Sequence, residues 1–535
     1  MSQGQQTLDT QSAGLPIYQA APPRRDTSKP SRIIMIYPEQ GVSGAYVRHM
    51  PLSLLYASVE LVQDGFDVKI LDTRLHPKDW HKRLKDLLSD DTLAVGISVM
   101  SGQPIKNATK IGRYIKSINP DTPIVWGGPH ATFYPENILE GEWSCDYVVS
   151  GYASETFHEL CLQIQQDEQP KDISGVCWRH EGEIFENPLL EKAFEYIDYD
   201  KIPYHLIEDY SPYGQLEQEH RIFSMYSAVG CPYQCSFCSS PAQYSNIDGK
   251  KWVPLEAAQV VDHIQHVHEK YGANYIYFID DDSFPKLSHV EGIIDEIANR
   301  GINVKLGFRG ARINEIKRMS HEFLNKLAAA GTDIMHIGAE SGSDRILKLL
   351  RKDSSYDDVI ACNQKLAQHP QITAAYNFIM GLPTETLEEL KMTRDLMLQL
   401  VEDHPNCIIF PPNKFRPLPG TELYDIAKDE WNYEMPDTLE AWANIEVEGD
   451  ISTQWYDKEF QRFCNLLLTS SYFVDNKVLR VTEGKTIPYK LVRLLNKLYR
   501  PLALFRLRNG LSRALFEYTA FRVISRLLVR DQGVG

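Results

Sequence analysis

Three cysteines lie close together near the middle of this chain of 535 residues, in the segment Gly230-Cys231-Pro232-Tyr233-Gln234-Cys235-Ser236-Phe237-Cys238. Thiolates are soft ligands that suit zinc or an iron–sulfur cluster. A structural zinc site needs a fourth Cys or His, but residues 221–257 hold no other cysteine and only His220 precedes them. Iron–sulfur clusters normally take four cysteines, so three predict a cluster with one iron left open for chemistry.

The surroundings of these cysteines predict their place in a fold. An apolar, β-branched stretch over 222–229 leads into them, and a helix is predicted over 254–271. The ligands are therefore expected in a loop at the carboxyl end of a strand. Active sites of α/β barrels lie at that end of the strands.

Two segments further along end a predicted strand in charged residues. Residues 275–284 alternate aromatic residues with Ile, as a buried strand does, and then reach Asp281 and Asp282. These acids are predicted to lie near a cofactor, with helix capping as the alternative. The short strand over 304–308 is followed by Arg312, for which an exposed loop cation is the alternative.

Three more segments carry glycine, glutamate and proline after predicted strands. Residues 334–343 end in Gly-Ala-Glu340-Ser341-Gly-Ser, and a glutamate at the end of an apolar strand is costly unless it is paired. Residues 376–386 contain Gly381-Leu-Pro-Thr-Glu-Thr, where glycine permits close approach of a ligand to the backbone. Residues 415–421 end in Pro-Gly-Thr.

Together, residues 217–450 resemble the radical SAM enzymes, a family whose C-x3-C-x-aromatic-C motif holds a [4Fe-4S] cluster. The resemblance implies a partial (β/α)6 barrel in which Cys231, Cys235 and Cys238 bind the cluster. S-adenosyl-L-methionine (SAM) would chelate the fourth iron and yield a 5'-deoxyadenosyl radical. The other residues that the resemblance places at the cofactors are Phe237, Asp281, Asp282, Arg312, Glu340, Ser341 and Gly381. It singles out no catalytic side chain.

The preceding region is predicted to be a second α/β domain. Strands are expected over 31–38, 67–72, 93–100, 123–127 and 146–150, with helices over 51–64, 80–88 and 106–118. Five strands interleaved with helices indicate a flavodoxin-like, doubly wound parallel sheet. Ligands of such sheets lie at the carboxyl ends of the strands.

The turns at those ends resemble the cobalamin-binding (B12-binding) domain that precedes many radical SAM cores. The segment Gly127-Gly128-Pro129-His130-Ala131-Thr132 is the best match, and the resemblance also implies cobalamin contacts at Ser98, Ser101 and Gly151. The D-x-H-x-x-G motif that supplies a histidine to cobalt elsewhere is absent. Asp72 and His76 are wrongly spaced for it, and His130 is interpreted as structural. An ordinary Rossmann-like domain is the alternative.

Composition sets limits on the remaining functions. The formal net charge of −16 argues against nucleic-acid binding, and nine cysteines fit a reducing cytoplasm. No apolar run approaches the ~18 residues that span a bilayer. The predicted order is a disordered segment over 1–30, the cobalamin-binding domain over 31–170, a hairpin and linker over 171–216, the radical SAM core over 217–450 and a helical, basic region over 451–535.

The C-terminal region has its own charge pattern. Residues 485–530 contain eleven Lys or Arg and one acid, Glu517, among apolar residues at helical spacing. Such a segment can lie peripherally on an anionic membrane. Packing on the barrel is the favoured interpretation, because Pro501 and the Asn509-Gly510 pair break the segment into short helices.

The resemblance implies a cobalamin-dependent enzyme that methylates an unactivated carbon of a small molecule, with an electron donor of flavodoxin or ferredoxin type. The alternatives are oxidative cyclisation, hydroxylation or ring rearrangement in tetrapyrrole or natural-product biosynthesis. An alternative of another class is a non-catalytic cobalamin or redox sensor. The identity of the substrate, the lower ligand of cobalt and the oligomeric state stay open.

Overall fold

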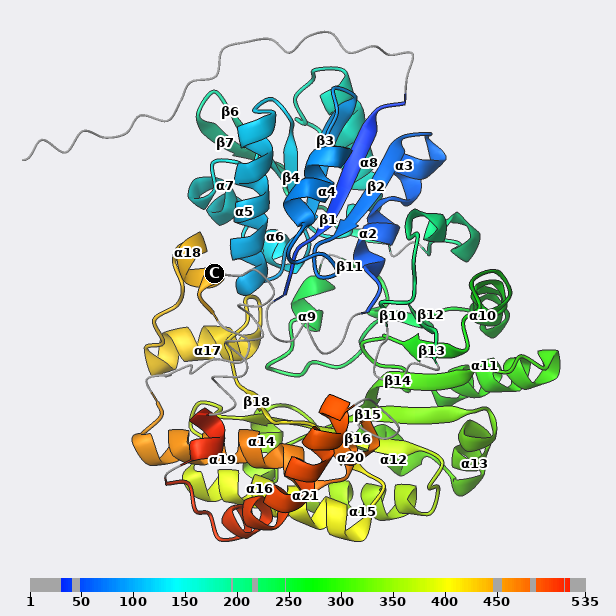
Figure 1. The fold of residues 1–535 in the computed structure, drawn as a ribbon, viewed down its shortest axis with the longest axis vertical. Helices are drawn as coiled ribbons and strands as arrows, with labels where there is room; N and C mark the ends of the chain where they lie inside the picture. The colour runs from blue at the N-terminus through cyan, green and yellow to red at the C-terminus, as the bar shows by residue number, and fades with distance from the viewer. Residues whose placement is uncertain are drawn as a thin grey trace, which may run out of the picture.

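A computed structural model describes residues 30–40, 49–193, 196–213, 220–245, 247–445, 455–481, 487–513 and 515–519. It contains two α/β domains in sequence, and Figure 1 shows the N-terminal one, drawn in blue and cyan, lying over the C-terminal one, drawn from green to red. The segment over 1–30 that was predicted to be disordered lies outside the described residues except for residue 30. So do residues 520–530 of the basic segment.

The N-terminal sheet has the predicted flavodoxin-like order. Its parallel strands run β2 (Asp67–Asp72), β1 (Arg32–Tyr37), β3 (Thr92–Ser98), β4 (Ile124–Gly127) and β5 (Tyr147–Val149). The four central residues of β1, Ile33 to Ile36, are apolar and buried because both faces of the strand are covered, as in other parallel sheets. The helices of this domain are α2 (Leu52–Ala57), α3 (Val59–Gln63), α4 (Trp80–Leu87), α5 (Gln103–Ile118), α6 (Pro129–Phe133), α7 (Pro135–Gly141) and α8 (Ala153–Gln165).

Two features differ from the sequence expectation. The single helix expected over 51–64 is divided at Ser58, whose hydroxyl donates to the carbonyl of Leu54 at 2.7 Å. The predicted hairpin forms as β6 (Val176–His180) and β7 (Glu183–Glu186), but it pairs antiparallel with β5 and so extends the sheet. Sequence analysis grouped this hairpin with the linker, because strand pairing over such distances leaves no local signal.

The C-terminal domain is the expected partial barrel of six parallel strands. Their order is β9 (Ile222–Met225), β13 (Tyr275–Phe278), β14 (Lys305–Arg312), β15 (Thr332–Glu340), β16 (Thr373–Met380) and β17 (Ile408–Ile409), and β18 (Asn413–Lys414) adds to β16. The helices between them are α10 (Ala257–Tyr271), α11 (Leu287–Arg300), α12 (Ile313–Arg318), α13 (His321–Ala329), α14 (Asp344–Leu349), α15 (Tyr356–Ala367) and α16 (Leu387–Asp403).

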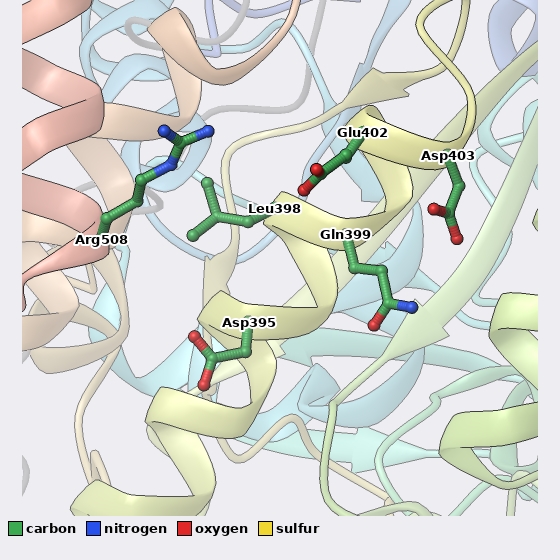
Figure 2. A pocket seen from close by; sticks show the side chains of 6 residues that line it. All are labelled: Asp395, Leu398, Gln399, Glu402, Asp403 and Arg508. Atoms are coloured by element: carbon green, nitrogen blue, oxygen red, sulfur yellow. The ribbon is translucent and has the colours of Figure 1, made fainter.

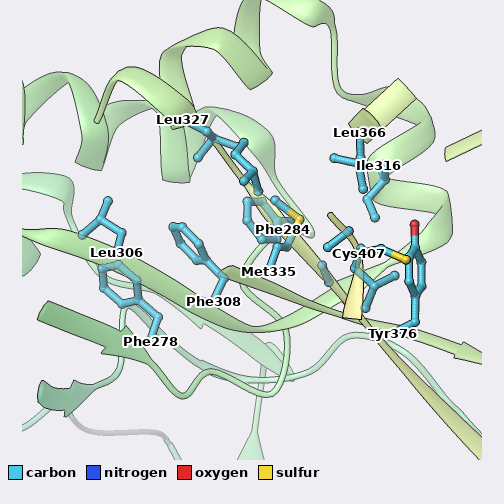
Figure 3. Close-up of a cluster of buried hydrophobic side chains, with 14 of the residues drawn as sticks. Phe278, Phe284, Leu306, Phe308, Ile316, Leu327, Met335, Leu366, Tyr376 and Cys407 are labelled. Carbon is cyan, nitrogen blue, oxygen red and sulfur yellow. The ribbon is translucent and has the colours of Figure 1, made fainter. Parts of the chain in front are cut away.

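Apolar side chains from alternate positions of these strands pack beneath the helices. Figure 3 shows Phe278, Phe308 and Met335 in this core, and the rings of Phe278 and Phe308 stack with centroids 5.1 Å apart. Successive residues of a strand point to opposite faces. The neighbouring Tyr277 and His336 therefore face the other side of the sheet, inside the barrel.

A segment from the second half of the chain returns to the N-terminal domain. Helix α18 (Leu439–Ala443) places Trp442, which is 1% exposed, in the apolar cluster beneath the N-terminal sheet. The amide of Gly102 donates to the carbonyl of Trp442 at 3.1 Å. Just before it, α17 (Glu422–Trp431) supplies Tyr424, whose hydroxyl lies 2.7 Å from that of Tyr134. The N-terminal core is thus completed by residues far along the chain.

The C-terminal region is helical, as expected. Helices α19 (Lys458–Val474), α20 (Lys477–Val481) and α21 (Ile487–Arg508) pack on the outer side of the barrel beside α16. Within the described residues, no helix is long and apolar enough to cross a membrane.

Candidate cofactor site at the junction of the two domains

The cysteine loop begins where the short strand β10 (Ala228–Gly230) ends. Buried Asp280, just after β13, accepts hydrogen bonds from the amides of Ser227 and Ala228 at 2.7 and 3.2 Å and from the Ser227 and Ser283 hydroxyls at 2.6 and 3.0 Å. These bonds fix the start of the loop against the neighbouring strand. Burial raises the pKa of Asp280 to about 6, although the same hydrogen bonds act to lower it.

The pKa of Asp280 predicts a pH dependence of stability that Asp280→Asn should remove. The folded pKa lies above the ordinary 3.8, so the folded chain binds the proton more tightly than the unfolded chain does. The free energy of unfolding should therefore fall as pH rises between these two values, by at most about 3 kcal/mol. Urea unfolding of both proteins at several pH values measures this, with exposed Asp90→Asn as control. Parallel pH profiles for wild type and Asp280→Asn would contradict the assignment.

The three thiols have different neighbours. Cys235 Sγ accepts a hydrogen bond from the guanidinium of Arg312 at 2.8 Å, and Cys238 Sγ lies 3.5 Å from the amide of Ser240. Burial raises the pKa of Cys231 to about 12, and it also raises the pKa of Cys238. Donors aimed at two of the sulfurs suit thiolate ligands, which carry negative charge.

Arg312 is held in place from several sides. Its guanidinium lies 4.0 Å from the ring centroid of Tyr233 and donates to the carbonyls of Arg351 and Lys352 at 3.3 and 3.1 Å. The Tyr233 hydroxyl donates to Glu315 at 2.8 Å, and the amide of Arg312 donates to the same carboxylate at 3.0 Å. The predicted strand-end arginine therefore contacts Cys235, one of the three predicted cluster ligands, and Arg312 as a whole is only 5% exposed.

The two predicted acids after β13 have different roles. Burial raises the pKa of Asp282, the adjacent Glu315 raises it further, and Arg312 lowers it. Asp281 accepts a hydrogen bond from the hydroxyl of Tyr244. Both acids lie near the cysteines, because their charges act on the pKa of Cys231.

Glu340 forms a buried ion pair at the end of β15. Its carboxylate lies 3.0 Å from Nζ of Lys352, and the two side chains are 10% and 6% exposed. Glu340 has a positive φ of 62°, and Gly338 leaves room for both charged groups, since a Cβ there would collide with them. Lys352 Nζ also lies 5.9 Å from the ring of Phe237, so the pair reaches the cysteine loop.

Two other predicted cofactor contacts have protein neighbours. The hydroxyl of buried Ser341 accepts from the amide of Ser343 at 3.1 Å and lies 3.3 Å from that of Thr393. Gly381 has φ of 79°, and the space that its Cβ would fill is occupied by Tyr456. The close backbone approach that this glycine allows is thus made by an aromatic side chain from the C-terminal region.

The predicted cobalamin contacts gather at the carboxyl edge of the N-terminal sheet, at the ends of β3, β4 and β5. Ser101 Oγ lies 2.9 Å from Nδ1 of buried His130, whose ring packs against Trp442. Gly128 has φ of 99°, and a Cβ there would press on Val99 and Ser98. These contacts support the structural interpretation of His130. The predicted residues at this edge are Ser98, Ser101, Gly127, Gly128, Pro129 and Gly151.

The two sets of residues meet at the domain junction. Tyr152, next to Gly151, stacks on Tyr244 with ring centroids 6.5 Å apart, and Tyr244 is the residue that bonds Asp281. A direct chain of contacts therefore joins the turn after β5 to the acids beside the cysteine loop.

Rings line the inner face of the barrel below this junction. His49 of the N-terminal domain stacks on Tyr277 at 5.4 Å, and His336 lies 6.0 Å from Tyr277 and 5.1 Å from Phe410. Burial, together with nearby Arg309, lowers the pKa of both histidines to about 4, so they are neutral at pH 7. No hydrogen bond or ion pair to the Arg309 side chain is found among the described residues.

A surface groove of about 520 Å³ lies elsewhere, on the outer side of the barrel. Figure 2 shows its lining by α16 and α21, with Asp395, Glu402, Asp403 and Arg508 among the side chains. It includes none of the predicted cofactor-binding residues.

Two family models match the two domains. The B12 binding domain matches residues 42–161, and the Radical SAM superfamily matches residues 225–397, which include all three cysteines of the loop. The chain belongs to the cobalamin-dependent radical SAM family.

Relatives of this radical SAM protein include an uncharacterized methyltransferase of Pyrococcus horikoshii, 27% identical over 70% of this chain and 78% of the relative. Another is the anaerobic magnesium-protoporphyrin IX monomethyl ester cyclase of Rubrivivax gelatinosus, 24% identical over 76% and 73%. The fold matches the cobalamin-dependent radical enzyme OxsB, solved with aqua-cobalamin and SAM, at a TM-score of 0.66 and 17% identity, over 93% of this chain and 76% of that one.

The residues present fit the cofactors of the family, which are a [4Fe-4S] cluster, SAM and cobalamin. Three thiols share one loop, and donors already face two of them. No set of three His, Cys, Asp or Glu side chains in the described residues converges on a single ion. Cluster thiolates bind different irons and do not need that convergence. The turns at Gly128 and Gly151 place backbone of positive φ, without side chains, at the carboxyl edge of the N-terminal sheet, where such sheets bind their ligands.

Sequence reasoning missed Lys352, Glu315 and Asp280. A buried glutamate at a strand end requires a cation. The sequence therefore indicates that Glu340 has a partner, but it does not indicate which residue that partner is. Of the consecutive acids Asp280, Asp281 and Asp282, the sequence prediction included only the last two. It left out Asp280, whose role depends on contacts with the neighbouring strand.

Proposed function

We propose that this enzyme methylates an unactivated carbon of a small molecule. The observation that carries the proposal is the contact chain from the cobalamin-side turn through Tyr152 and Tyr244 to Asp281 beside the cysteine loop. When bound there, cluster-held SAM supplies hydrogen-atom abstraction and cobalamin supplies the methyl group. Both cofactors would then act on one substrate between the domains. Relatives named as methyltransferases support this reaction.

The chain's own residues would orient the cofactors and exclude water. Arg312 holds the sulfur of Cys235 from one side while Tyr233 and two carbonyls fix its guanidinium. The Glu340–Lys352 pair fixes the end of β15 beside Phe237. Protein groups of this kind set orientation, and the cofactors carry the difficult chemistry.

We place the substrate against the ring-lined inner face of the barrel. Tyr277, His336 and Phe410 offer flat apolar surface, and Arg309 offers an unpaired cation within the described residues for an anionic or carbonyl oxygen. Two neutral histidines there can accept or donate hydrogen bonds without adding charge. A structure of the reconstituted enzyme with its methyl acceptor tests this placement.

Product analysis tests the function. Protein reconstituted without oxygen is reduced and supplied with SAM, cobalamin and candidate acceptors, and nucleoside products are separated by chromatography. Methyl transfer yields S-adenosylhomocysteine together with 5'-deoxyadenosine. Formation of 5'-deoxyadenosine alone with a changed substrate would favour the cyclase or hydroxylase alternative, and no SAM cleavage by intact, reduced protein would favour the sensor.

Two further partners and a cellular compartment belong to this proposal. Reductive cleavage of SAM needs one electron, for which we propose a donor of flavodoxin or ferredoxin type. A reducing compartment such as the cytoplasm keeps the cluster thiols unoxidised. Peripheral contact with a membrane through the C-terminal region is supported by exposed apolar residues on α21.

A further inference from the structure

Helix α21 carries a stripe of exposed apolar side chains. Leu494, Leu495, Leu498, Leu502 and Phe505 are between 43% and 69% exposed. At 3.6 residues per turn they fall on one side of the helix and extend over roughly 16 Å. Single exposed leucines are ordinary, but a contiguous apolar surface marks an interaction site.

The opposite side of α21 fixes how the helix is turned. Ala503 and Leu507 are buried, and Leu507 belongs to the core of the barrel. Arg500 donates to the side chain of Asn476 at 2.7 Å and to the carbonyl of Val474 at 3.2 Å. Because these contacts hold the helix on α19 and α20, the apolar stripe is directed away from the protein.

Positive charge borders the stripe. Lys490 and Lys497 are exposed, lie seven residues apart and therefore share one side of the helix, next to Leu494 and Leu498. Residues 487–513 contain no Asp or Glu, in a chain whose net charge is −16. Arg508 adjoins the acidic groove on α16, so its charge is partly balanced there.

We infer that this stripe rests on a membrane surface rich in anionic headgroups, with the leucines and Phe505 among the acyl chains and both lysines at the phosphates. Apolar centres with lysine edges are typical of interfacial helices. A second copy of the chain fits less well, because lysine is depleted in protein interfaces. This docking rests on the membrane contact proposed above and specifies its surface. An apolar methyl acceptor would then reach the enzyme directly from the bilayer.

Vesicle sedimentation of the full-length holoprotein tests the docking. Wild type is expected to sediment with vesicles of phosphatidylcholine and phosphatidylglycerol and more weakly with phosphatidylcholine alone. The triple change Leu498→Gln, Leu502→Gln and Phe505→Gln should weaken partitioning roughly 100-fold. The double change Lys490→Gln and Lys497→Gln should remove the preference for phosphatidylglycerol.

The matched control is Leu190→Gln, which changes a leucine that is 58% exposed on the N-terminal domain. Equal partitioning of the triple variant and wild type would overturn the inference. So would a concentration-dependent dimer in sedimentation equilibrium that the triple change abolishes. Anaerobic SAM cleavage without vesicles is measured in parallel. Cleavage without vesicle binding refutes the docking alone, and vesicle binding without cleavage refutes the enzymatic proposal alone.

Discussion

Cys235→Ala is expected to lose the iron–sulfur cluster and to lower reductive SAM cleavage by about 10³-fold or more. Only three cysteines lie in the loop, and Cys235 is the one whose sulfur accepts a hydrogen bond from the guanidinium of Arg312. Its removal leaves two of the predicted ligands and takes away the sulfur that accepts the hydrogen bond from Arg312. Iron and sulfide analysis with chromatography of 5'-deoxyadenosine measures both effects.

Cys362→Ala is the control, because Cys362 is buried in the same barrel but packs in its apolar core. It should keep the cluster. The Cys235 variant should still bind cobalamin, since the turns at Gly128 and Gly151 belong to the other domain. A Cys235 variant that cleaves SAM at the wild-type rate would refute the cluster assignment.

Lys352→Met should destabilise the folded chain by about 3–5 kcal/mol. The change keeps the length of the side chain but removes the charge, and it leaves the Glu340 carboxylate buried without the cation 3.0 Å away. Denaturant unfolding of the apoprotein measures the loss. Exposed Lys348→Met on the adjacent helix is the matched control.

The double variant Glu340→Gln with Lys352→Met separates a missing partner from a missing contact. Once the carboxylate is neutral, most of the stability should return, because no charge is left buried. A double variant as unstable as Lys352→Met alone would show that the lysine acts through packing on Phe237. SAM affinity of both variants then reports whether the pair also serves the cofactor.

Local patterns were enough to predict most of the fold. Strands such as β3 and β13 are buried, largely apolar runs, and the sheet order follows from the alternation of strands with helices. The division at Ser58, whose hydroxyl donates to the carbonyl of Leu54, was missed because the apolar periodicity continues through it. The pairing of β6 with β5 and the position of α18 depend on contacts between distant parts of the chain, which a window of sequence does not contain.

The site was predictable where a motif fixes the chemistry. The cysteine spacing gives a clear signal, whereas Arg312 was predicted with an exposed loop cation as the alternative. The structure brings Arg312 and Cys235 together. Lys352 lies just after a helix, in a segment that contains no recognisable sequence motif. Only the three-dimensional fold therefore pairs it with Glu340. Gly381 shows the opposite case, since a glycine indicates close approach but does not say that the approaching group is Tyr456.

The return of α18 to the N-terminal core sets an order of events during synthesis on the ribosome. The first domain can pair its strands early, but its apolar cluster gains Trp442 only when residue 442 has been made. At ordinary rates of translation the roughly 250 intervening residues take about 10–50 s. A nascent first domain must wait that long with part of its core uncovered, and expressing it alone would leave that surface open permanently.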